Sequence, residues 1–415
     1  MVNSSLTSEV SPILERSIAG LLVFWVCAAG AGPARIVTGP DTGGRVTSQS
    51  ITGNLHAVAG SVFPYSTSFS GGVRVAAGDV NGDGGPDLIT GSGPGATHVK
   101  VFAGAGLQVV HSFFAYPLTF TGGVFVAAGD VNGDGFADII TGPDQGAAPL
   151  VKVFSGATGV EIRSFFAYTS SYMGGVRVAS GDVNGDGFAD IITATGAGGG
   201  PHLTVFNGVT GAVIYSFFAY ESNFTGGFYV AAGDLNGDGR ADIITAPGSG
   251  TSEIKAFSGA TGAPFISFPA YAPVITGGVR VAAGDMDGDG LAEILTVPGP
   301  GAGSQIRIFN SVTLAERASF FAYTRSYADG VFLGASSMVR PQLRIAALPA
   351  PGNLQITWES GFITQLQSAT LPNTPGGWGN VATLPTQTGQ QMKLPVTVSS
   401  PAKFFRLQYD EEATP

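Results

Sequence analysis

The stretch that decides the fold is GGVRVAAGDVNGDGGPDLIT, at residues 71–90. Two short runs rich in β-branched and apolar residues, VRVAAG and DLIT, lie on either side of a loop of Asp, Asn and Gly. Runs of this kind, bounded by turn residues, predict two β-strands joined by a tight connection. The stretch recurs four times, with the first loop Asp at 79, 130, 182, 234 and 285, at spacings of 51, 52, 52 and 51 residues. A fixed period of this length predicts a repeat architecture.

Each unit holds two further strand-like runs. In the unit that begins at Gly71 these are HVKVFAG at 98–104 and VVHSFFAY at 109–116. Four short antiparallel strands per unit are typical of a propeller blade, in which radial repetition leaves only short edges. A solenoid is the alternative for a repeat of this length.

The two ends of the repeat region favour a closed ring. The region begins at Ile36 with the second, third and fourth strands of a unit, and it ends at residues 331–334 with a lone first strand. Together these ends supply one complete blade, which predicts an all-β, six-bladed β-propeller over residues 32–340, closed by its N- and C-terminal strands. The sixth unit has no acidic loop, because residues 335–338 read ASSM. If residues 22–30 form a strand, the ring would close differently, and seven blades is the alternative.

The composition agrees with this fold and excludes several functions. Charged residues make up 12% of the chain, against roughly 25% in an average soluble domain, and Gly accounts for 64 of 415 residues. Long helices are disfavoured, since an interior Gly costs about 1 kcal/mol and an interior Pro about 3 kcal/mol. The net charge of −10 argues against a nucleic-acid-binding protein, which needs a basic face. Sixteen of the 29 acidic residues lie in the five loops, so the acidity points to cations instead.

Each acidic loop has the form D-x-N/D-x-D-G-x-x-D/E. It offers side-chain oxygens at positions one, three, five and nine, and the Gly at position six permits a sharp turn. Calcium prefers six to eight oxygen ligands at about 2.3 to 2.6 Å, whereas magnesium demands stricter octahedral geometry. Calcium, about one ion per loop and five in all, is therefore the predicted metal. Turns held by Asx hydrogen bonds without any metal are the alternative.

The predicted ligands are the four side chains of each loop together with the backbone carbonyl at position seven. They are Asp79, Asn81, Asp83, Gly85 and Asp87; Asp130, Asn132, Asp134, Phe136 and Asp138; Asp182, Asn184, Asp186, Phe188 and Asp190; Asp234, Asn236, Asp238, Arg240 and Asp242; and Asp285, Asp287, Asp289, Leu291 and Glu293.

With residues 71–90 and their four later copies, the chain resembles the FG-GAP/VCBS repeat family, which includes the integrin α-chain propellers. The resemblance covers about 300 of the 415 residues. It implies that the calcium loops join the first and second strands of a blade, on the ring face opposite the ligand-binding loops, and that the calcium serves structure. Residues 93–95 read Gly-Pro-Gly where integrins carry their FG-GAP signature, so integrin ligands are not implied.

The two ends of the chain differ from the repeats. The stretch from Ile18 to Gly32 is uncharged and follows Arg16, and residues 29–31 form a small-x-small cleavage site. This pattern predicts a signal peptide over residues 1–31, hence a secreted or cell-surface protein with no transmembrane span in the mature chain; that the protein is bacterial is implied by the family resemblance. Glu9 and Glu15 are unusual for a signal peptide, and a strand is the alternative for this stretch.

Beyond Pro341 short strand-like runs alternate with turns, which predicts a small β-sandwich at residues 341–415. This part resembles small C-terminal modules of exported bacterial proteins, through Trp358, Trp378 and the FFRL run at 404–407.

No catalytic or cofactor-binding residues stand out, since the chain has no GxSxG or HExxH motif. A row of bulky residues two positions before each Gly pair would suit either packing between blades or binding of sugars. We therefore predict a calcium-binding propeller that recognises a carbohydrate or protein ligand. A polysaccharide-active enzyme such as a lyase is one alternative, and a structural surface-layer component is another. The row is Phe69, Phe120, Tyr172, Phe224, Ile275 and Tyr327.

Overall fold

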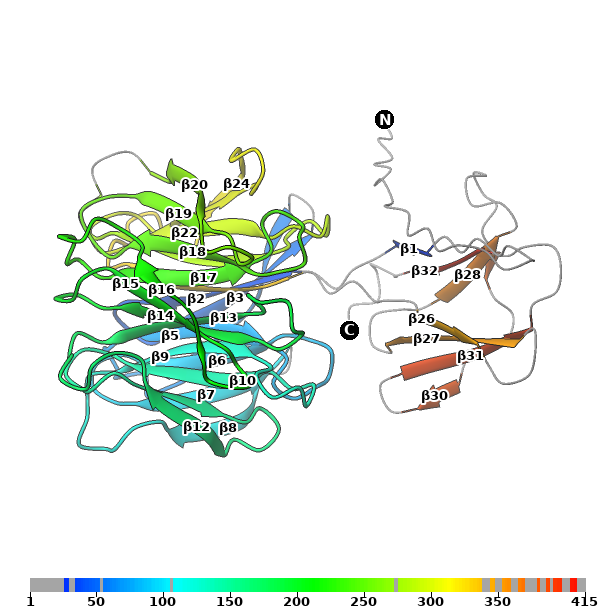
Figure 1. Ribbon diagram of the computed structural model, residues 1–415, viewed down its shortest axis with the longest axis horizontal. Coiled ribbons are helices and arrows are strands. Elements are labelled where there is room, and N and C mark those ends of the chain that lie inside the picture. Colours follow the sequence, from blue (N-terminus) through cyan, green and yellow to red (C-terminus); the bar gives the residue numbers. More distant parts are fainter. Residues whose placement is uncertain are drawn as a thin grey trace. The chain divides into compact units, whose positions relative to one another are not determined.

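The computed structural model describes most of the repeat region and several strands outside it. The described residues are 34–52, 55–104, 107–271 and 275–337, with the separate strands at 26–29, 344–347, 353–359, 365–369, 379–380, 386–388, 391–397 and 404–408. All regular structure among them is β-strand, as the composition predicts. The chain divides into two units, one of residues 33–338 and one of residues 1–32 with 339–415 (Figure 1).

The first unit is built of six antiparallel sheets of four strands each, which are the blades. Blade one is β5 (Val73–Gly78), β6 (Asp87–Ser92), β7 (His98–Ala103) and β8 (Gln108–Phe114); blade two is β9 (Val124–Gly129), β10 (Asp138–Pro143), β11 (Leu150–Phe154) and β12 (Glu161–Phe166); blade three is β13 (Val176–Gly181), β14 (Asp190–Thr195), β15 (His202–Phe206) and β16 (Val213–Phe218). Blade four is β17 (Phe228–Gly233), β18 (Asp242–Pro247), β19 (Glu253–Phe257) and β20 (Pro264–Pro269); blade five is β21 (Val279–Gly284), β22 (Glu293–Pro298), β23 (Gln305–Phe309) and β24 (Glu316–Phe321); blade six is β25 (Val331–Ser336), β2 (Ala34–Pro40), β3 (Val46–Thr52) and β4 (Leu55–Val62).

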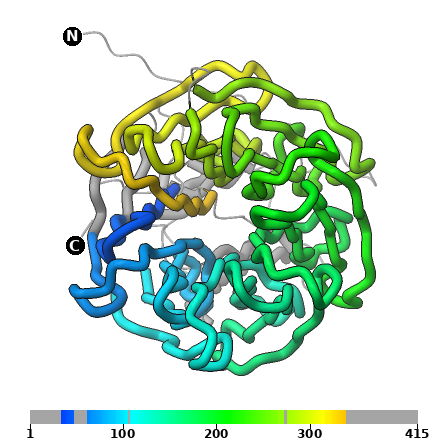
Figure 2. Tube along the Cα trace, turned by 90° about the vertical axis from the view of Figure 1, so that its left-hand side faces the viewer, coloured from blue at the N-terminus to red at the C-terminus, as the bar shows by residue number. Residues whose placement is uncertain are grey.

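Blade six closes the ring with strands from both ends of the repeat region. β25 pairs antiparallel with β2, in a register that runs from Arg35 opposite Ser336 to Pro40 opposite Val331. Figure 2 shows this pairing, with the blue start of the ring beside its orange end. The prediction of six blades closed in this way is confirmed.

The burial of each strand follows its place in the blade. The first strands of successive blades are neighbours around the ring, and every second strand of blades one to five is buried along its whole length. A strand covered on both faces needs a continuous apolar run, which explains sequences such as DIIT. The fourth strands have exposed positions that alternate with less exposed ones, as in β12.

A tyrosine at the end of each repeat fastens one blade to the next. In each case its hydroxyl donates a hydrogen bond to a backbone carbonyl at the start of the next blade's third strand. The six bonds are Tyr65 to His98 at 2.7 Å, Tyr116 to Leu150 at 2.8 Å, Tyr168 to His202 at 3.0 Å, Tyr220 to Glu253 at 3.2 Å, Tyr271 to Gln305 at 2.9 Å and Tyr323 to Arg45 at 2.9 Å. The last bond crosses the closure of the ring.

Most of the bulky residues before the Gly pairs pack onto these tyrosines. Phe69 lies edge-on to Tyr65, with their ring centroids 5.3 Å apart. The ring centroids of Tyr327 and Tyr323 are 4.9 Å apart. Packing therefore accounts for this row in large part.

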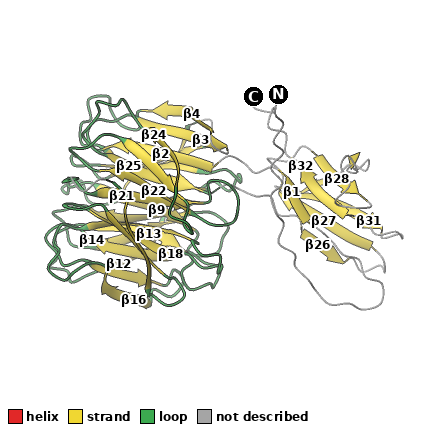
Figure 3. Ribbon diagram, turned by 90° about the horizontal axis from the view of Figure 1, so that it is seen from above, coloured by secondary structure: helices red, strands yellow, loops and turns green. Residues whose placement is uncertain are grey.

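The second unit contains two four-stranded sheets (Figure 3). Their strands are β1 (Val26–Ala29), β32 (Phe404–Gln408), β28 (Gln365–Ala369) and β29 (Gly379–Asn380) in one sheet, and β26 (Arg344–Ala347), β27 (Asn353–Glu359), β31 (Gln391–Thr397) and β30 (Thr386–Thr388) in the other.

The strand β1 bears on the number of blades. It pairs in parallel with β32, outside the propeller, so it adds no seventh blade. The remainder of residues 1–31, and most of residues 341–415, lie outside the described residues. Removal of residues 1–31 as a signal peptide therefore stays a prediction, and so does the β-sandwich at residues 341–415. Among the described residues there is no helix of the length and apolar character that crossing a membrane requires.

The ring closure generates a testable prediction. Tyr323→Phe removes the donor to the carbonyls of Thr38 and Arg45, at 3.0 and 2.9 Å, and should lower the free energy of unfolding by about 1 to 3 kcal/mol. Tyr229→Phe is the matched control, because no described residue bonds its hydroxyl and the chain itself has Phe at the equivalent Phe125. Denaturant unfolding measures both variants. Equal stability of the two would contradict the role given to Tyr323.

Candidate metal loops and a surface pocket

The five acidic loops connect the first strand to the second strand in blades one to five, as residues 79–86 do between β5 and β6. The Asp at position one shapes each turn. The amide of Gly84 donates to Asp79 Oδ2 at 2.8 Å, and Gly84 has a φ of 85°, a conformation that favours glycine. The same bond occurs in the other four loops at 2.8 to 3.0 Å. The sequence pattern thus produces five equivalent turns.

The carboxylate at position nine anchors the loop inside the blade. Asp87 is 1% exposed. Its carboxylate accepts hydrogen bonds from the backbone amides of Val80 and Asn81, each at 3.0 Å, and from that of Gly104 at 2.9 Å. Gly156, Gly208 and Gly259 donate in the same way in blades two, three and four. This partner, in the turn between the third and fourth strands, has no signature in the acidic motif, and the sequence analysis missed it.

Burial controls the protonation of these anchoring carboxyl groups. Desolvation outweighs the amide hydrogen bonds and raises the pKa of Asp87, Asp138 and Asp242 to about 6. It also raises the pKa of Asp190. The charged form of these groups therefore needs a positive partner.

In the first and third loops the side chain at position three lies within hydrogen-bonding distance of the side chains at positions five and nine. The amide nitrogen Nδ2 of Asn81 lies 3.0 Å from Asp83 Oδ2 and 3.2 Å from Asp87 Oδ1. In the third loop, Asn184 contacts Asp186 and Asp190 in the same way, at 2.9 and 3.3 Å. A single small group can thus touch both carboxylates, which is the geometry that a bound cation requires.

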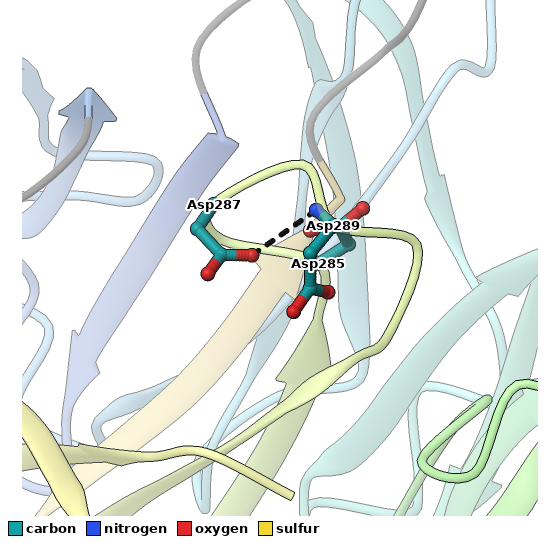
Figure 4. A group of neighbouring side chains, drawn as sticks. All are labelled: Asp285, Asp287 and Asp289. Atoms are coloured by element: carbon teal, nitrogen blue, oxygen red, sulfur yellow. Dashed lines mark hydrogen bonds between the residues drawn. The ribbon is translucent and has the colours of Figure 1, made fainter. Parts of the chain in front are cut away.

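The fifth loop gathers the most charge. The carboxylate oxygens of Asp285, Asp287 and Asp289 lie within 4.8 Å of one another, and the Asp289 amide donates to Asp287 Oδ1 at 3.1 Å (Figure 4). These are hard oxygen donors from a nine-residue turn, which fits the ligand chemistry of calcium.

The fifth loop also has a cation of its own, which the sequence analysis did not foresee. Arg317 of β24 makes ion pairs with Asp287 and, at 3.0 Å, with Glu293. Burial raises the pKa of Glu293 to about 7 in spite of this pair. The sequence differs from the other loops at the two positions that contact Arg317, with Asp287 in place of Asn at position three and Glu293 in place of Asp at position nine.

Contacts around the ring join the loops to one another. In loops two to five, the Ala at position eight donates its amide to the carbonyl at position one of the preceding loop, as Ala137 does to Asp79 at 2.7 Å. The side chain at position seven covers a glycine of the preceding loop. A Cβ on Gly82 would lie 2.7 Å from the ring of Phe136. The other amide bonds are Ala189 to Asp130, Ala241 to Asp182 and Ala292 to Asp234.

A surface pocket of about 520 Å³ lies at the opposite end of blade three from its acidic loop. Five aromatic side chains and His202 line it, together with Gly199 and Gly200 after β14. His202 shares a hydrogen bond with Ser216 Oγ at 2.8 Å, and burial lowers the pKa of this imidazole. The lining contains no Arg or Lys among the described residues. The five aromatic residues are Phe166, Tyr168, Tyr172, Phe206 and Phe218.

Comparison with known proteins agrees with the repeat pattern. A family model described as an FG-GAP-like repeat matches residues 79–141, 182–245 and 234–296. Among solved structures, the crystal structure of the rhamnogalacturonan lyase YesW is similar at 14% sequence identity and a TM-score of 0.35, covering 80% of this chain and 69% of that chain. A similarity this low carries no argument about activity.

The raised pKa values predict an unusual pH dependence. A carboxyl group with a folded-state pKa above its unfolded value of about 4 stabilises the fold below that value, and this contribution is lost as pH rises through about 6 to 7. The calcium-free protein should therefore melt at a higher temperature at pH 5 than at pH 7.5. Saturating calcium should cancel or reverse this trend, because a cation favours the charged form. A higher melting temperature at pH 7.5 without calcium would refute the prediction.

Proposed function

Because this chain is an FG-GAP repeat β-propeller, we propose that it is a calcium-stabilised recognition module that works outside the cell. The observation that carries the proposal is the convergence of side-chain oxygens in the acidic loops. In the first loop, one donor atom already reaches both Asp83 and Asp87. Calcium in its place would meet several hard oxygen ligands and would neutralise two or three carboxylates per loop.

The proposed role of calcium is structural. Loops one to four are each bonded to the following loop and to the turn between strands three and four of their own blade, as Asp87 is to Gly104. An ion that orders one loop therefore also orders the contact between two blades. The anchoring carboxyl groups are buried, so an ion that favours their charged form stabilises the folded state over the unfolded chain.

Location outside the cell is consistent with this dependence. Extracellular calcium modules commonly bind with dissociation constants of about 0.1 to 1 mM, which requires the calcium supply of the exterior. The uncharged stretch between Ile18 and Gly32 supports the same proposal, as a signal for export.

For recognition, the pocket on blade three is the proposed site for a carbohydrate ligand. Its exposed aromatic rings, Phe166 at 52% and Phe218 at 54%, offer flat apolar surfaces, and Tyr172 and His202 add polar atoms beside them. Concave apolar surfaces with a few convergent polar groups are typical of small-molecule sites. A lyase would need a base together with a charge-neutralising group, and the lining supplies His202 without a cation, which favours binding over catalysis. No observation favours the surface-layer alternative.

The calcium proposal predicts a large effect of metal removal. At a tenfold excess of calcium over the dissociation constant, each occupied loop should add about 1.4 kcal/mol to the free energy of unfolding. Thermal melting of the full chain with EDTA and with 10 mM calcium measures the sum. Asp134→Asn removes one ligand charge and should reduce the calcium-induced shift by about a fifth.

Asp329→Asn is the matched control for that variant. Asp329 lies outside the acidic loops and accepts a hydrogen bond from Thr42 at 2.7 Å. This variant should keep the whole calcium-induced shift. An unchanged melting temperature of the unsubstituted chain on chelation would remove the basis of the proposal.

The recognition proposal is tested separately on a glycan array with calcium present. Loss of one aromatic ring by Phe218→Ala should weaken binding of any captured glycan about tenfold, since an aromatic contact contributes about 1 to 1.5 kcal/mol. Phe265→Ala is the control, because Phe265 is an exposed phenylalanine on the fourth strand of blade four and does not line the pocket. Equal weakening by both variants, or no captured glycan, would contradict a carbohydrate site on blade three.

A further inference from the structure

The second residue of each first strand faces the axis of the ring, and its identity alternates between arginine and an aromatic residue. In blade order the six residues are Arg74, Phe125, Arg177, Tyr229, Arg280 and Phe332.

These six side chains form one continuous ring of contacts. The centroids of the three aromatic rings lie 6.2 to 6.4 Å from one another, edge to face. Each arginine lies over two of these rings, at 4.6 to 5.3 Å from the centroids. Cation–π contact of this kind holds a guanidinium in place without satisfying its hydrogen-bond donors.

Two of the three arginines are neutralised by an aspartate of the next blade. Arg74 Nη2 lies 2.5 Å from Asp144 Oδ2, and Arg280 Nη2 lies 2.6 Å from Asp41 Oδ2. Both arginine side chains are 7% exposed or less. These are buried, charge-assisted pairs, which are stronger than exposed ones.

The third arginine has no such partner. The backbone places Gly248 where the other two blades have Asp41 and Asp144. The amides of these three residues donate to the carbonyls of Gly227, Gly330 and Gly123 at 2.8, 3.0 and 3.0 Å, so the three positions are equivalent.

The consequence at Arg177 is an unpaired charge. No described residue forms an ion pair with the guanidinium of the half-buried Arg177. Its Nε and Nη1 are buried without a hydrogen-bond partner, as are Nε and Nη1 of Arg280. The difference from Arg74 and Arg280 is that each of those pairs its Nη2 with an aspartate. Asp144, the nearest equivalent acid, is already paired with Arg74.

We propose that Arg177, which faces Gly248 where the equivalent arginines face an aspartate, binds the carboxylate group of a small ligand. A guanidinium surrounded by aromatic rings and lacking a counter-ion is costly, and a carboxylate can match its fork of donors. A carboxylate is the favoured anion because the two equivalent positions are filled by carboxylates from the chain itself. This site is separate from the acidic loops. Arg177 does not line the pocket on blade three, although its charge acts on Tyr168 and Tyr172, which do. The variants below alter no residue of the pocket lining, so they test this proposal apart from the carbohydrate proposal.

The ligand carboxylate can come from a simple organic acid or from an acidic sugar. The probes are therefore acetate and glucuronate, with glucose plus sodium chloride at equal ionic strength as the neutral control. Calorimetric titration of the calcium-saturated full chain should show saturable binding of one carboxylate per chain and none of glucose. Equal binding of both acids would identify a general carboxylate site, and binding of glucuronate alone would identify an acidic-sugar site. Failure of both acids to bind would overturn the proposal.

The decisive variant is Gly248→Asp, which supplies the missing carboxylate from the chain. It should weaken binding of the acid at least tenfold, and without ligand it should melt at a higher temperature than Gly248→Ala, which shares its steric cost but brings no carboxylate. Gly248→Ala is the matched control, because a Cβ here comes within 2.7 Å of the Gly226 carbonyl and the steric effect must be separated from the charge. Unchanged binding in Gly248→Asp, or equal loss in both variants, would overturn the proposal.

A second variant keeps the test valid if Gly248→Asp does not fold. Asp144→Gly removes the partner of Arg74 and should create a second site, so the stoichiometry should rise from one carboxylate per chain to two. A stoichiometry that stays at one would overturn the assignment.

Discussion

The closure of the ring is the constraint on which the rest of the structure depends. A blade is a four-stranded sheet with two apolar faces, and it can bury both only between two neighbours. Blade six meets this requirement with strands about 300 residues apart in the chain, β25 and β2, paired over six residues. The hydroxyl of Tyr323 then donates to a backbone carbonyl across the closure. An equivalent tyrosine makes the same bond between each of the five remaining pairs of neighbouring blades. The fully buried second strands depend on this arrangement, since an open ring would expose one face of a terminal blade.

The acidic loops add a second series of contacts between neighbouring blades, from blade one to blade five. Loops two to five each contact the preceding loop through an amide at position eight and a side chain at position seven, so Ala137 and Phe136 of the second loop hold Asp79 and Gly82 of the first. The carboxylates are therefore held close together before any metal binds. Their mutual repulsion and burial favour protonation, and this makes the same loops a suitable place for a divalent cation.

Equivalent positions in the repeats are not equivalent in chemistry. The loops keep one pattern through five blades, whereas the residues facing the axis alternate between arginine and aromatic types with a period of two blades. One member of this second pattern departs from it, because Gly248 stands where Asp41 and Asp144 provide counter-ions. The fifth acidic loop shows the reverse change, because a charged partner is gained there instead of lost. Arg317 supplies a positive charge to its carboxylates. A repeat fold conserves backbone geometry, and substitutions on that geometry create or remove individual sites.

The sequence by itself determined the strands, the period of the repeat and the closure by its two ends, because these follow from local patterns of apolar, turn and acidic residues. It also located the oxygen donors of each loop, since their spacing lies within nine consecutive residues. The amide of Gly104 on Asp87, the guanidinium of Arg317 in the fifth loop and the unpaired Arg177 were decided by the tertiary structure alone. Each of these depends on residues 17 to 71 positions apart in the chain that only the packing of strands and blades brings together, and no local pattern records which side chain will meet which charge.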